Sequence, residues 1–467
     1  MQDYLQGNID DTNDSLGRFE EMNFVNKEFY FDVHQIENMF DHYLDKNQIA
    51  MADQILSVGI KQHPDALSLQ IKQAIILTEQ GEYDKALTIL HKGIRFETNS
   101  IEIYMTLAWL YLKKGDIKSA LSAFNFVLNN AVEDREQCLF DMAYNLNGDG
   151  FYIQTIEILE KNIHSYINNK NLLFELAFAY DKEEIIEKGI EAYIKLLDLD
   201  PFYENSWYNL GILYSKTEEF EDAIKAYDYA LAIDPYHPES VFNKGNALAH
   251  LDQFDKALDL YLDYCSLTGI NVLSLQYIGE CWEQINNPIM AIRFYELALT
   301  QSVIHPDVWY GLGTSNMNLL KFDIATDAFL KAIALFPENP DYWLALAKCY
   351  FETKNYPNSL DSIKKSIDLE PDNTLAWIEL FQLKSLISDR FNAIRFIEKA
   401  LINFPSVGAV AYIAAHIYLT IGKDADLAFA YFKIGFKNQP EDYDLILAEF
   451  PDLLKVAAIK KFTSKKR

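Results

Sequence analysis

Apolar and polar positions alternate along residues 204–237 with the spacing of two short amphipathic helices. In the first half, apolar or small residues are separated by three, one and three positions, at Trp207, Leu210, Gly211 and Tyr214. This spacing places them on one face of a helix. After the polar turn SKTEEFED, a second helix shows a similar periodicity at Ala223, Tyr227 and Ala230. The segment predicts a helical hairpin with one apolar side, ended by a proline that lacks a backbone donor, Pro235.

The hairpin pattern returns every 34 residues. Stepping forward from Glu204, the tryptophan position is held by Val241, Leu275, Trp309, Trp343, Trp377 and Ala411. The closing proline also returns in several units, at Pro201, Pro337, Pro371 and Pro405. Counted in both directions, the repeat predicts twelve units, 33–66, 67–100, 101–135, 136–169, 170–203, 204–237, 238–271, 272–305, 306–339, 340–373, 374–407 and 408–442.

The pattern W-x2-L-G-x2-Y, followed by A-x3-[FY]-x2-A and a proline, resembles the tetratricopeptide repeat. Residues 204–237 match all eight positions, and 306–339 match all but one, with Asn316 where tyrosine would stand. The resemblance covers close to nine-tenths of the chain. It implies an all-α fold, an α-solenoid in which the hairpins stack into a right-handed superhelix. Since one hairpin cannot bury its apolar side alone, each must pack on its neighbour.

Two units depart from the pattern. In 136–169, the two small residues and the proline are replaced by Thr155, Asn162 and Ile167. In 238–271, a small position holds Tyr264 and the proline position holds Gly269. Each departure is interpreted either as a hinge or as sequence drift without consequence.

The two ends of the array are expected to be covered. Residues 1–32 hold eight acids and two bases, and form a predicted acidic arm and cap through Phe19, Met22, Phe24, Phe29, Tyr30 and Phe31. An alternative is that this arm occupies the protein's own binding groove. Residues 443–467 predict a capping helix over 443–462 and a short basic tail, KKFTSKKR. The tail is either solvated, folded back on the acidic body, or in contact with an acidic partner.

The overall charge excludes some classes of partner. The formal net charge is -28, and such a surface repels both nucleic-acid phosphates and anionic membranes. The most apolar stretch, 408–422, is shorter than a bilayer span and is expected to be a core helix. No secretory signal is recognised at the start of the sequence, and the four cysteines are scattered. We therefore expect a cytoplasmic protein that binds no nucleic acid and inserts into no membrane.

No catalytic or metal-binding motif stands out. The sequence has no HExxH, no Gly-x-Ser-x-Gly and no phosphate-binding loop, and its cysteines and histidines lack zinc spacing. We expect no catalytic, cofactor-binding or metal residue, and no enzyme. His416 is interpreted as a groove contact rather than a base, and Cys281 and Cys349, which hold the same place in their units, as small core residues.

One stretch of the sequence offers a calcium site as an alternative. Four residues fall at positions 1, 3, 5 and 6 of a calcium loop, namely Asn145, Asn147, Asp149 and Gly150. Position 12 of that loop would be Ile156, where a bidentate glutamate is required. The segment also coincides with the turn between the two helices of its unit, where glycine and asparagine are expected anyway.

The repeat family lines its concave face with positions 2, 5, 9 and 12 of each first helix. Positions 5 and 9 are apolar or aromatic from the second unit to the start of the seventh, at Ile71, Ile75, Met105, Trp109, Phe140, Tyr144, Phe174, Phe178, Tyr208, Ile212 and Phe242. Farther along, one or both positions become polar. The favoured interpretation is a peptide groove, and the alternative is a stripe of core residues. No lysine or arginine stands at position 5, so the carboxylate-gripping site of chaperone-docking relatives is not expected.

The resemblance and the groove together predict a non-catalytic scaffold or adaptor. Its partners would be proteins that offer apolar or amphipathic segments, with basic flanks that suit the acidic chain. One alternative is a regulatory protein that senses a peptide and changes conformation on binding. Self-association through the aromatic face, giving a homo-oligomer, is a further possibility.

Overall fold

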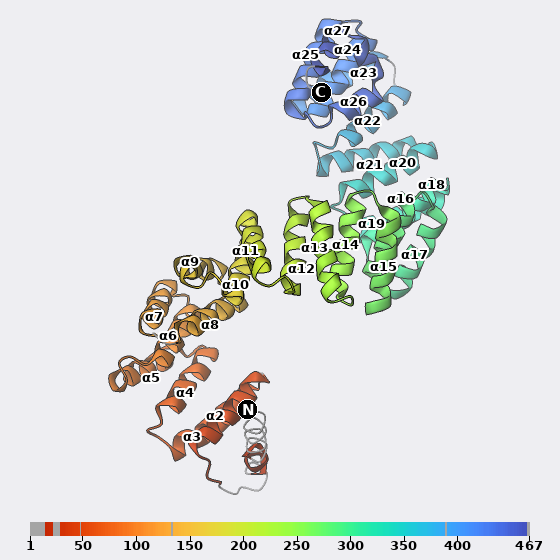
Figure 1. The fold of residues 1–467 in the computed structure, drawn as a ribbon. Helices are drawn as coiled ribbons and strands as arrows, with labels where there is room; N and C mark the ends of the chain where they lie inside the picture. Colours follow the sequence, from red (N-terminus) through yellow and green to blue (C-terminus); the bar gives the residue numbers. More distant parts are fainter. Residues whose placement is uncertain (1–14, 22–28, 47, 132–133, 388–389, 465–467) are drawn as a thin grey trace. The chain divides into compact units, whose positions relative to one another are not determined.

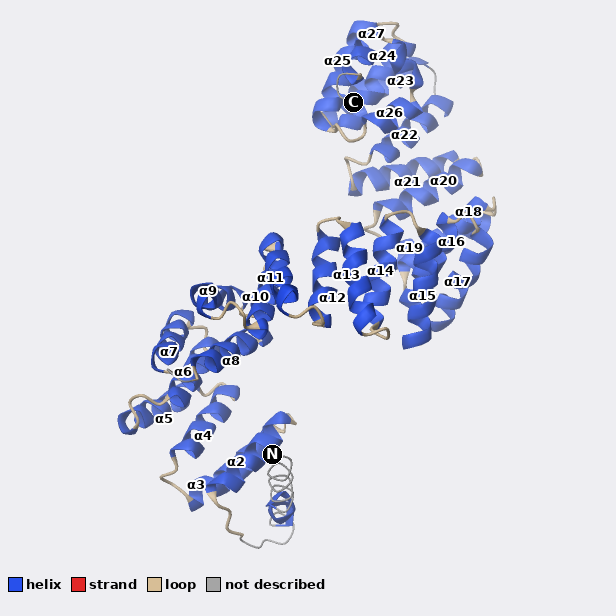
Figure 2. Cartoon of the chain, in the orientation of Figure 1, coloured by secondary structure: helices blue, strands red, loops and turns tan. Residues whose placement is uncertain are grey.

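The computed structural model describes residues 15–21, 29–46, 48–131, 134–387 and 390–464. Over these residues the protein is helical, with short connecting loops and no β-strand (Figure 2). The chain divides into two compact units, Met1–Leu213 and Tyr214–Arg467, and the boundary falls within α12. In both units consecutive helices pack as pairs, and each pair packs on the next. The prediction of an all-α solenoid is confirmed.

The first unit contains the helices drawn from red to yellow in Figure 1. Each first helix packs on the second helix of its pair, and the second helices α3, α5, α7 and α9 also contact the following first helix. The helices are α2 (Val33–Asp45), α3 (Ile49–Gln62), α4 (Leu67–Glu79), α5 (Tyr83–Phe96), α6 (Ile101–Lys113), α7 (Ile117–Asn130), α8 (Arg135–Gly148), α9 (Tyr152–Asn162), η1 (Ile163–Ser165), α10 (Lys170–Lys182), α11 (Ile186–Leu199) and the greater part of α12 (Glu204–Lys216).

The second unit continues the same arrangement, from α13 to the end of the described chain. Its helices are α13 (Phe220–Ile233), α14 (Pro238–His250), α15 (Phe254–Thr268), α16 (Val272–Gln284), α17 (Pro288–Gln301), α18 (Pro306–Asn318), α19 (Phe322–Leu335), α20 (Pro340–Glu352), α21 (Tyr356–Leu369), α22 (Thr374–Ile387), α23 (Arg390–Asn403), α24 (Gly408–Thr420), α25 (Ala425–Asn438), α26 (Tyr443–Glu449), η2 (Pro451–Lys455) and α27 (Ala457–Thr463).

The turn inside nine successive pairs, from α4 and α5 to α20 and α21, has one backbone conformation. The second residue after the first helix has a positive φ, between 57° and 83°, at Gly81, Gly115, Gly150, Glu184, Glu218, Asp252, Asn286, Leu320 and Lys354. The next N–H donates to the carbonyl five residues earlier, at 2.7–2.9 Å in all nine turns. This is the Schellman bond, which satisfies a helix carbonyl that would otherwise lack a donor. Six of the nine positions are not glycine, so this hydrogen bond offsets a left-handed conformation that costs about 1 kcal/mol.

The two helices of a pair are held together by a buried ring against a small residue. Tyr295 of α17 is fully buried and lies between Gly279 of α16 and Gly311 of α18. A Cβ at Gly279 would lie 2.5 Å from Cε1 of Tyr295, and one at Gly311 would lie 2.4 Å from Cζ. Phe329 packs in the same way against Gly313, whose Cβ would lie 2.5 Å from the ring. The glycines in the repeat are therefore required by close approach of the neighbouring ring.

The tryptophans of the repeat join one pair to the loop before it. Each indole Nε1 donates to the carbonyl six residues earlier, at 2.8–2.9 Å, in the pairs Trp207–Pro201, Trp309–Val303, Trp343–Pro337 and Trp377–Pro371. The bond fixes the start of a first helix against the end of the preceding second helix. It gives a physical reason for the tryptophan and proline positions that recur together in the sequence.

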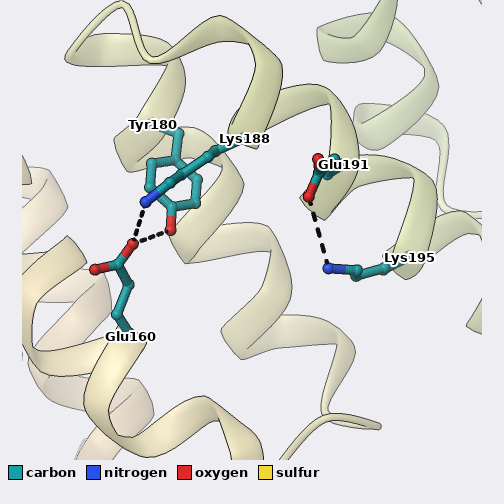
Figure 3. A network of polar contacts seen from close by, with 5 residues as sticks. All are labelled: Glu160, Tyr180, Lys188, Glu191 and Lys195. Atoms are coloured by element: carbon teal, nitrogen blue, oxygen red, sulfur yellow. Dashed lines mark hydrogen bonds and ion pairs between the residues drawn. The ribbon is translucent and has the colours of Figure 1, made fainter.

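The unit 136–169 departs from the others in structure as well as in sequence. Its second helix, α9, has 11 residues and continues as the short 3-10 helix η1, whereas the second helices α11 and α13 have 14 residues. A pocket of about 480 Å³ opens beside it, over Leu173 and Leu176. Figure 3 shows how polar contacts bridge its edge, where Glu160 accepts hydrogen bonds from Tyr180 and Lys188, each at 2.7 Å.

The charge network at this edge affects the pKa of its carboxyl group. The hydrogen bond from Lys188 has the largest effect and lowers the pKa of Glu160, and the hydrogen bond from Tyr180 lowers it further. A second ion pair in Figure 3, between Lys195 and Glu191, spans 4.0 Å. These side chains are about half exposed, so the pairs contribute little to the free energy of unfolding. The departure is a local change of shape, and whether it acts as a hinge stays a prediction.

The unit 238–271 departs at its end. Helix α15 has 15 residues and stops at Gly269, which has a φ of 84° where other units place a proline. The Tyr264 ring, at the small-residue position, packs 5.0 Å from the ring of Phe242 on α14. The larger side chain is thus accommodated by an aromatic partner on the first helix.

The described residues at the two ends pack on the terminal helices. Phe19 and Phe31 are fully buried in the cluster formed by α2 and α3, while Met22 and Phe24 lie outside the described residues. At the other end, the predicted single capping helix over 443–462 is wrong in detail. Residues 443–463 form three short helices, because Pro451 cannot continue α26, and Ile446, Leu453 and Ile459 are fully buried.

The apolar stretch 408–422 contains α24, a helix of 13 residues of which nine are buried. No helix in the described part of the chain combines the length and apolar character needed to cross a membrane.

The glycine–ring contact predicts the result of a single substitution. Gly279→Ala should lower the free energy of unfolding by about 1–3 kcal/mol. The new methyl group would overlap the Tyr295 ring, and the packed helices leave neither group room to move aside. Urea unfolding followed by circular dichroism measures this change.

Gly148→Ala is the matched control. A Cβ at Gly148 meets no atom within 4 Å, so alanine there should leave the stability unchanged or raise it by up to about 1 kcal/mol through helix propensity. Equal midpoints for both variants would contradict the packing argument.

Candidate functional site

The first helices of successive pairs contact one another and so form one face in each unit. In the first unit α4 contacts α6 and α8 contacts α10, and in the second unit α16 contacts α18 and α18 contacts α20. We call the residues at positions 2, 5, 9 and 12 of these helices, and their immediate neighbours, the first-helix face. The eleven candidates from the sequence all lie on these helices.

Two candidates share a pocket on the first-helix face of the first unit. Ile75 of α4 and Trp109 of α6 line a hollow of about 260 Å³, together with Thr78, Thr106 and Asn145. The Trp109 indole is half buried and is held edge-on by the Phe124 ring, with centroids 5.2 Å apart. One side of the indole is thereby fixed by packing while the other borders the pocket.

Charged side chains close this pocket at its rim. Lys113 of α6 lies 3.9 Å from Glu79 of α4 and 3.5 Å from Asp149 at the end of α8. All three side chains are more than a third exposed, so each pair contributes less than about 1 kcal/mol. Because one lysine faces two carboxylates, the rim carries more negative than positive charge.

The calcium-loop alternative is not supported by the geometry. Asn145 and Asn147 lie within helix α8 and not in a loop. The Asn145 amide donates to the Asp141 carbonyl at 2.7 Å, and the buried Asn147 amide donates to Glu175 of α10 at 2.7 Å. In the described residues, no group of three or more histidine, cysteine, aspartate or glutamate side chains is arranged to hold a metal ion.

Four other candidates form two aromatic pairs on adjacent first helices. Phe140 and Tyr144 of α8 have centroids 5.9 Å apart, and the Tyr144 side chain is 60% exposed. Phe174 and Phe178 of α10 are stacked with centroids 6.4 Å apart and are half buried. The ammonium group of Lys182 lies 5.0 Å from the centroid of Phe178. These rings are held by their neighbours yet remain partly accessible to solvent.

The remaining candidates are placed differently. Ile71 is only 2% exposed, because α4 packs against α3, α5 and α6, so this side chain belongs to the interior and not to an open surface. Met105, Tyr208 and Ile212 are half buried on α6 and α12. Phe242 lies in the second unit, within 5.2 Å of the Tyr277 ring and 5.5 Å of the Tyr261 ring.

The second unit carries a larger pocket on its own first-helix face. We call it the α16 pocket; it measures about 590 Å³ and lies over α14, α16 and α18, with side chains from α15 and α17. Its walls are largely aromatic, and its rings come from Phe254, Tyr261, Tyr277, Tyr295 and Tyr310. Three carboxylates complete the lining, Glu280, Glu283 and Asp307.

Neutral donors hold these carboxylates in place. Glu283 accepts hydrogen bonds from Tyr295 at 2.8 Å, Thr314 at 2.6 Å and Ser315 at 2.7 Å. Asp307 accepts from the Tyr342 hydroxyl at 2.5 Å. The groups are therefore oriented by hydroxyl groups, and the described lining contains no lysine or arginine to neutralise them.

Glu280 shows the electrostatic consequence. Burial raises the pKa of its carboxyl group, the hydrogen bond from Gln276 at 2.9 Å lowers it, and the charges on Glu283 and Asp307 raise it again. The pocket thus concentrates negative charge where solvent screens it poorly.

The sequence missed this pocket although its residues occupy the same positions as the candidates. Asp307, Tyr310 and Glu280 stand at positions 2, 5 and 9 of their helices. In the sequence these positions stand out only as the part of the array where one or both groove positions become polar. The available signal was the combination of acid and tyrosine at positions that should face outward.

The last two first helices are covered by the chain's own C-terminal segment. The His416 ring of α24 stacks on Phe450, with centroids 4.3 Å apart, and Phe381 of α22 lies 5.9 Å from the same ring. The Gln382 amide donates to Glu449 at 2.6 Å. His416 was predicted to be a groove contact, whereas in the structure its ring packs on this protein's own chain.

The two equivalent cysteines lie in the interior. Cys281 is 3% exposed and Cys349 fully buried, and burial raises their pKa values to about 12 and about 11. Both thiols therefore stay protonated near neutral pH.

Comparison with known proteins agrees with the helical-pair architecture. Family models of the tetratricopeptide repeat match residues 101–128, 205–237 and 310–374. Among proteins of curated function, none is similar enough in sequence to count as a relative.

Several solved structures are similar in fold. YrrB, described as a TPR protein with an unusual peptide-binding site, is 21% identical over 40% of this chain and 96% of its own, with a TM-score of 0.33. A tetratricopeptide repeat protein from Parabacteroides merdae is 15% identical over 53% of this chain and 98% of its own, with a TM-score of 0.38. Yeast Tom70 is 14% identical over 91% of this chain and 96% of its own, with a TM-score of 0.46.

The helical pairs, the 34-residue period and the family matches define an α-solenoid built from one repeated hairpin. The chain contains tetratricopeptide repeats.

The covered His416 predicts a pH dependence of stability. Burial lowers the pKa of its imidazole, while Asp452 and Glu449 raise it, and the net shift is downward. Below the ordinary histidine value of about 6.5 the unfolded chain binds the proton more readily, so stability is lost as the pH falls toward the lower folded value. The change in the free energy of unfolding of the wild type between about pH 7.5 and about pH 5.5, measured with urea, should include this loss. Its size should be about 1 kcal/mol or less after solvent screening.

The neutral variant His416→Gln isolates the effect from that of the carboxylates. Its change in unfolding free energy between the two pH values should be smaller than that of the wild type. A variant with the same pH dependence as the wild type would show that His416 makes no contribution.

Proposed function

We propose that this protein is a non-catalytic scaffold that binds segments of other proteins along the first-helix face of its first unit. The observation that carries the proposal is the set of packed but accessible rings on that face, Trp109, Phe140, Tyr144, Phe174 and Phe178. Rings of this kind make effective anchors because they bring large apolar area at a low cost in side-chain entropy. Tetratricopeptide repeats act in general as protein-interaction modules, which supports the same conclusion.

The geometry favours an extended or helical segment with apolar side chains. The pocket between Ile75 and Trp109 accepts one such side chain, and the pairs on α8 and α10 offer flat rings for others. Ile71 is left out of the proposed surface because it is buried. The surface is thus a series of separate anchor points and not a continuous apolar trough.

Charge adds a preference for basic flanks. The chain carries a net charge of -28, and Glu79 and Asp149 lie at the rim of the Trp109 pocket. A segment with basic residues beside its apolar core would be attracted at long range, and the attraction would weaken with salt.

The peptide-sensing alternative uses the same surface and adds a change of conformation. The departure at α9 supplies a place where the repeat is irregular, with a shorter helix and an adjoining pocket. Compaction on binding, measured by small-angle scattering, separates a sensor from a passive scaffold.

The proposal predicts the loss of specific partners from a groove variant. Trp109→Ala/Phe174→Ala/Phe178→Ala should capture fewer proteins than the wild type from a native lysate, since each central aromatic anchor contributes about 2 kcal/mol. For a partner segment purified afterwards, the dissociation constant measured by fluorescence anisotropy should rise at least about a hundredfold.

Phe96→Ala/Phe202→Ala is the matched control. These two rings are 76% and 79% exposed and lie off the first-helix face, so their removal should leave capture unchanged. Circular dichroism first confirms that both variants are folded. Identical captures by the wild type and the groove variant would mean that the aromatic residues serve packing alone.

A further inference from the structure

The α16 pocket is built differently from the anchor points of the first unit. Its carboxylates lie among five aromatic side chains and no lysine or arginine, whereas the Trp109 pocket has one aromatic side chain and a lysine that pairs with its two rim carboxylates. Tyr277 and Tyr310 line the same space as Glu280 and Asp307. Two kinds of group bind an organic cation. An aromatic ring binds it through its π face, and a carboxylate binds it through its charge.

The carboxylates of this pocket have no positive partner in the described structure. Their hydrogen bonds come from hydroxyl and amide groups, and no ion pair joins a described lysine or arginine to Glu280, Glu283 or Asp307. Glu280 and Glu283 are half buried while Asp307 is exposed, and a partly buried negative charge without a counter-charge is unfavourable. A cation entering the pocket would offset that cost, while an apolar side chain would increase it.

We propose that the α16 pocket receives an arginine side chain from a partner protein segment. The inference deepens the proposed function and rests on it only in taking the ligand to be a protein segment. A guanidinium group is planar, stacks on aromatic rings and donates two parallel hydrogen bonds to one carboxylate, which suits a space walled by Tyr277 and Tyr310 with Glu280 and Asp307 beside them.

Other occupants fit the pocket less well. Among the described residues, no group of three or more histidine, cysteine, aspartate or glutamate side chains is arranged to hold a metal ion. A lysine ammonium offers charge but neither the plane that stacks nor the fork that matches a carboxylate. Tyr295 and Thr314 fix Glu283 by hydrogen bonds, so the charge is oriented before the ligand arrives.

A pair of isosteric peptides tests this assignment. The probes are the fluorescein-labelled peptide Ser-Leu-Leu-Arg-Leu-Leu-Ser and the same peptide with citrulline, which has the shape of arginine without its charge. Fluorescence anisotropy with the full chain at physiological salt should show at least about tenfold tighter binding of the arginine peptide. Replacement of arginine by lysine should give an intermediate affinity.

Neutral variants of the pocket supply the second measurement. Glu280→Gln/Asp307→Asn should strongly reduce the difference between the two peptides, because the shape is kept and two of the three carboxylate charges are lost. Glu296→Gln is the matched control, since Glu296 is exposed on α17 and does not line the pocket. It should keep the wild-type difference.

The outcomes separate this inference from the proposed function. If Glu280→Gln/Asp307→Asn weakens only the arginine peptide while Trp109→Ala changes neither, the arginine site stands and the proposed first-unit surface fails. If Trp109→Ala weakens both peptides equally and the pocket variant neither, the arginine site is overturned and the proposed function stands. Equal binding of arginine and citrulline peptides by the wild type also overturns the arginine site, without recourse to any variant.

Discussion

The contact between a buried ring and a glycine on the facing helix is the constraint on which the stack depends. Tyr295 lies so close to Gly279 and Gly311 that no side chain fits at either position. Helices of 13 or 14 residues are marginal alone, so they depend on packing against their neighbours, and the glycine–ring contact returns at Gly245 and Gly313. Each such ring is worth about 1.5–3 kcal/mol through burial of its apolar surface.

The same buried tyrosines connect packing to chemistry. Their rings fill the stack, while their hydroxyl groups extend to the first-helix face, where Tyr295 donates to Glu283 and Tyr261 donates to Asn246 at 2.7 Å. A phenylalanine in their place would pack equally well, as Phe329 does, but would leave the carboxylate without its donor. The floor of the α16 pocket is therefore made by residues that the fold requires in any case, and only its acids are additional.

The sequence predicted the repeating hairpins well because periodicity records burial directly. Trp309, Gly313 and Phe329 recur at fixed spacing since each has a fixed structural partner. The turn conformation could not be predicted in the same way. Leu320 and Lys354 adopt a positive φ that their residue types disfavour. They do so because the N–H of the following residue donates to the carbonyl five residues before it, and this hydrogen bond stabilises the turn.

The candidate residues of the first-helix face were predicted only where they are apolar or aromatic, as expected for a peptide groove. Trp109 and Phe178 follow from position alone, whereas the burial of Ile71 depends on three neighbouring helices that no local pattern reveals. Glu280 and Asp307 were not among the candidates, since a sequence does not show that tyrosine and phenylalanine side chains from four helices line a pocket with them. A polar residue at an outward position can be either a solvated surface residue or part of a binding site. Which of the two it is depends on how far the surrounding side chains exclude water. In a chain of net charge -28, acids in open solvent discriminate weakly among partners, whereas acids held among rings discriminate by charge and shape together.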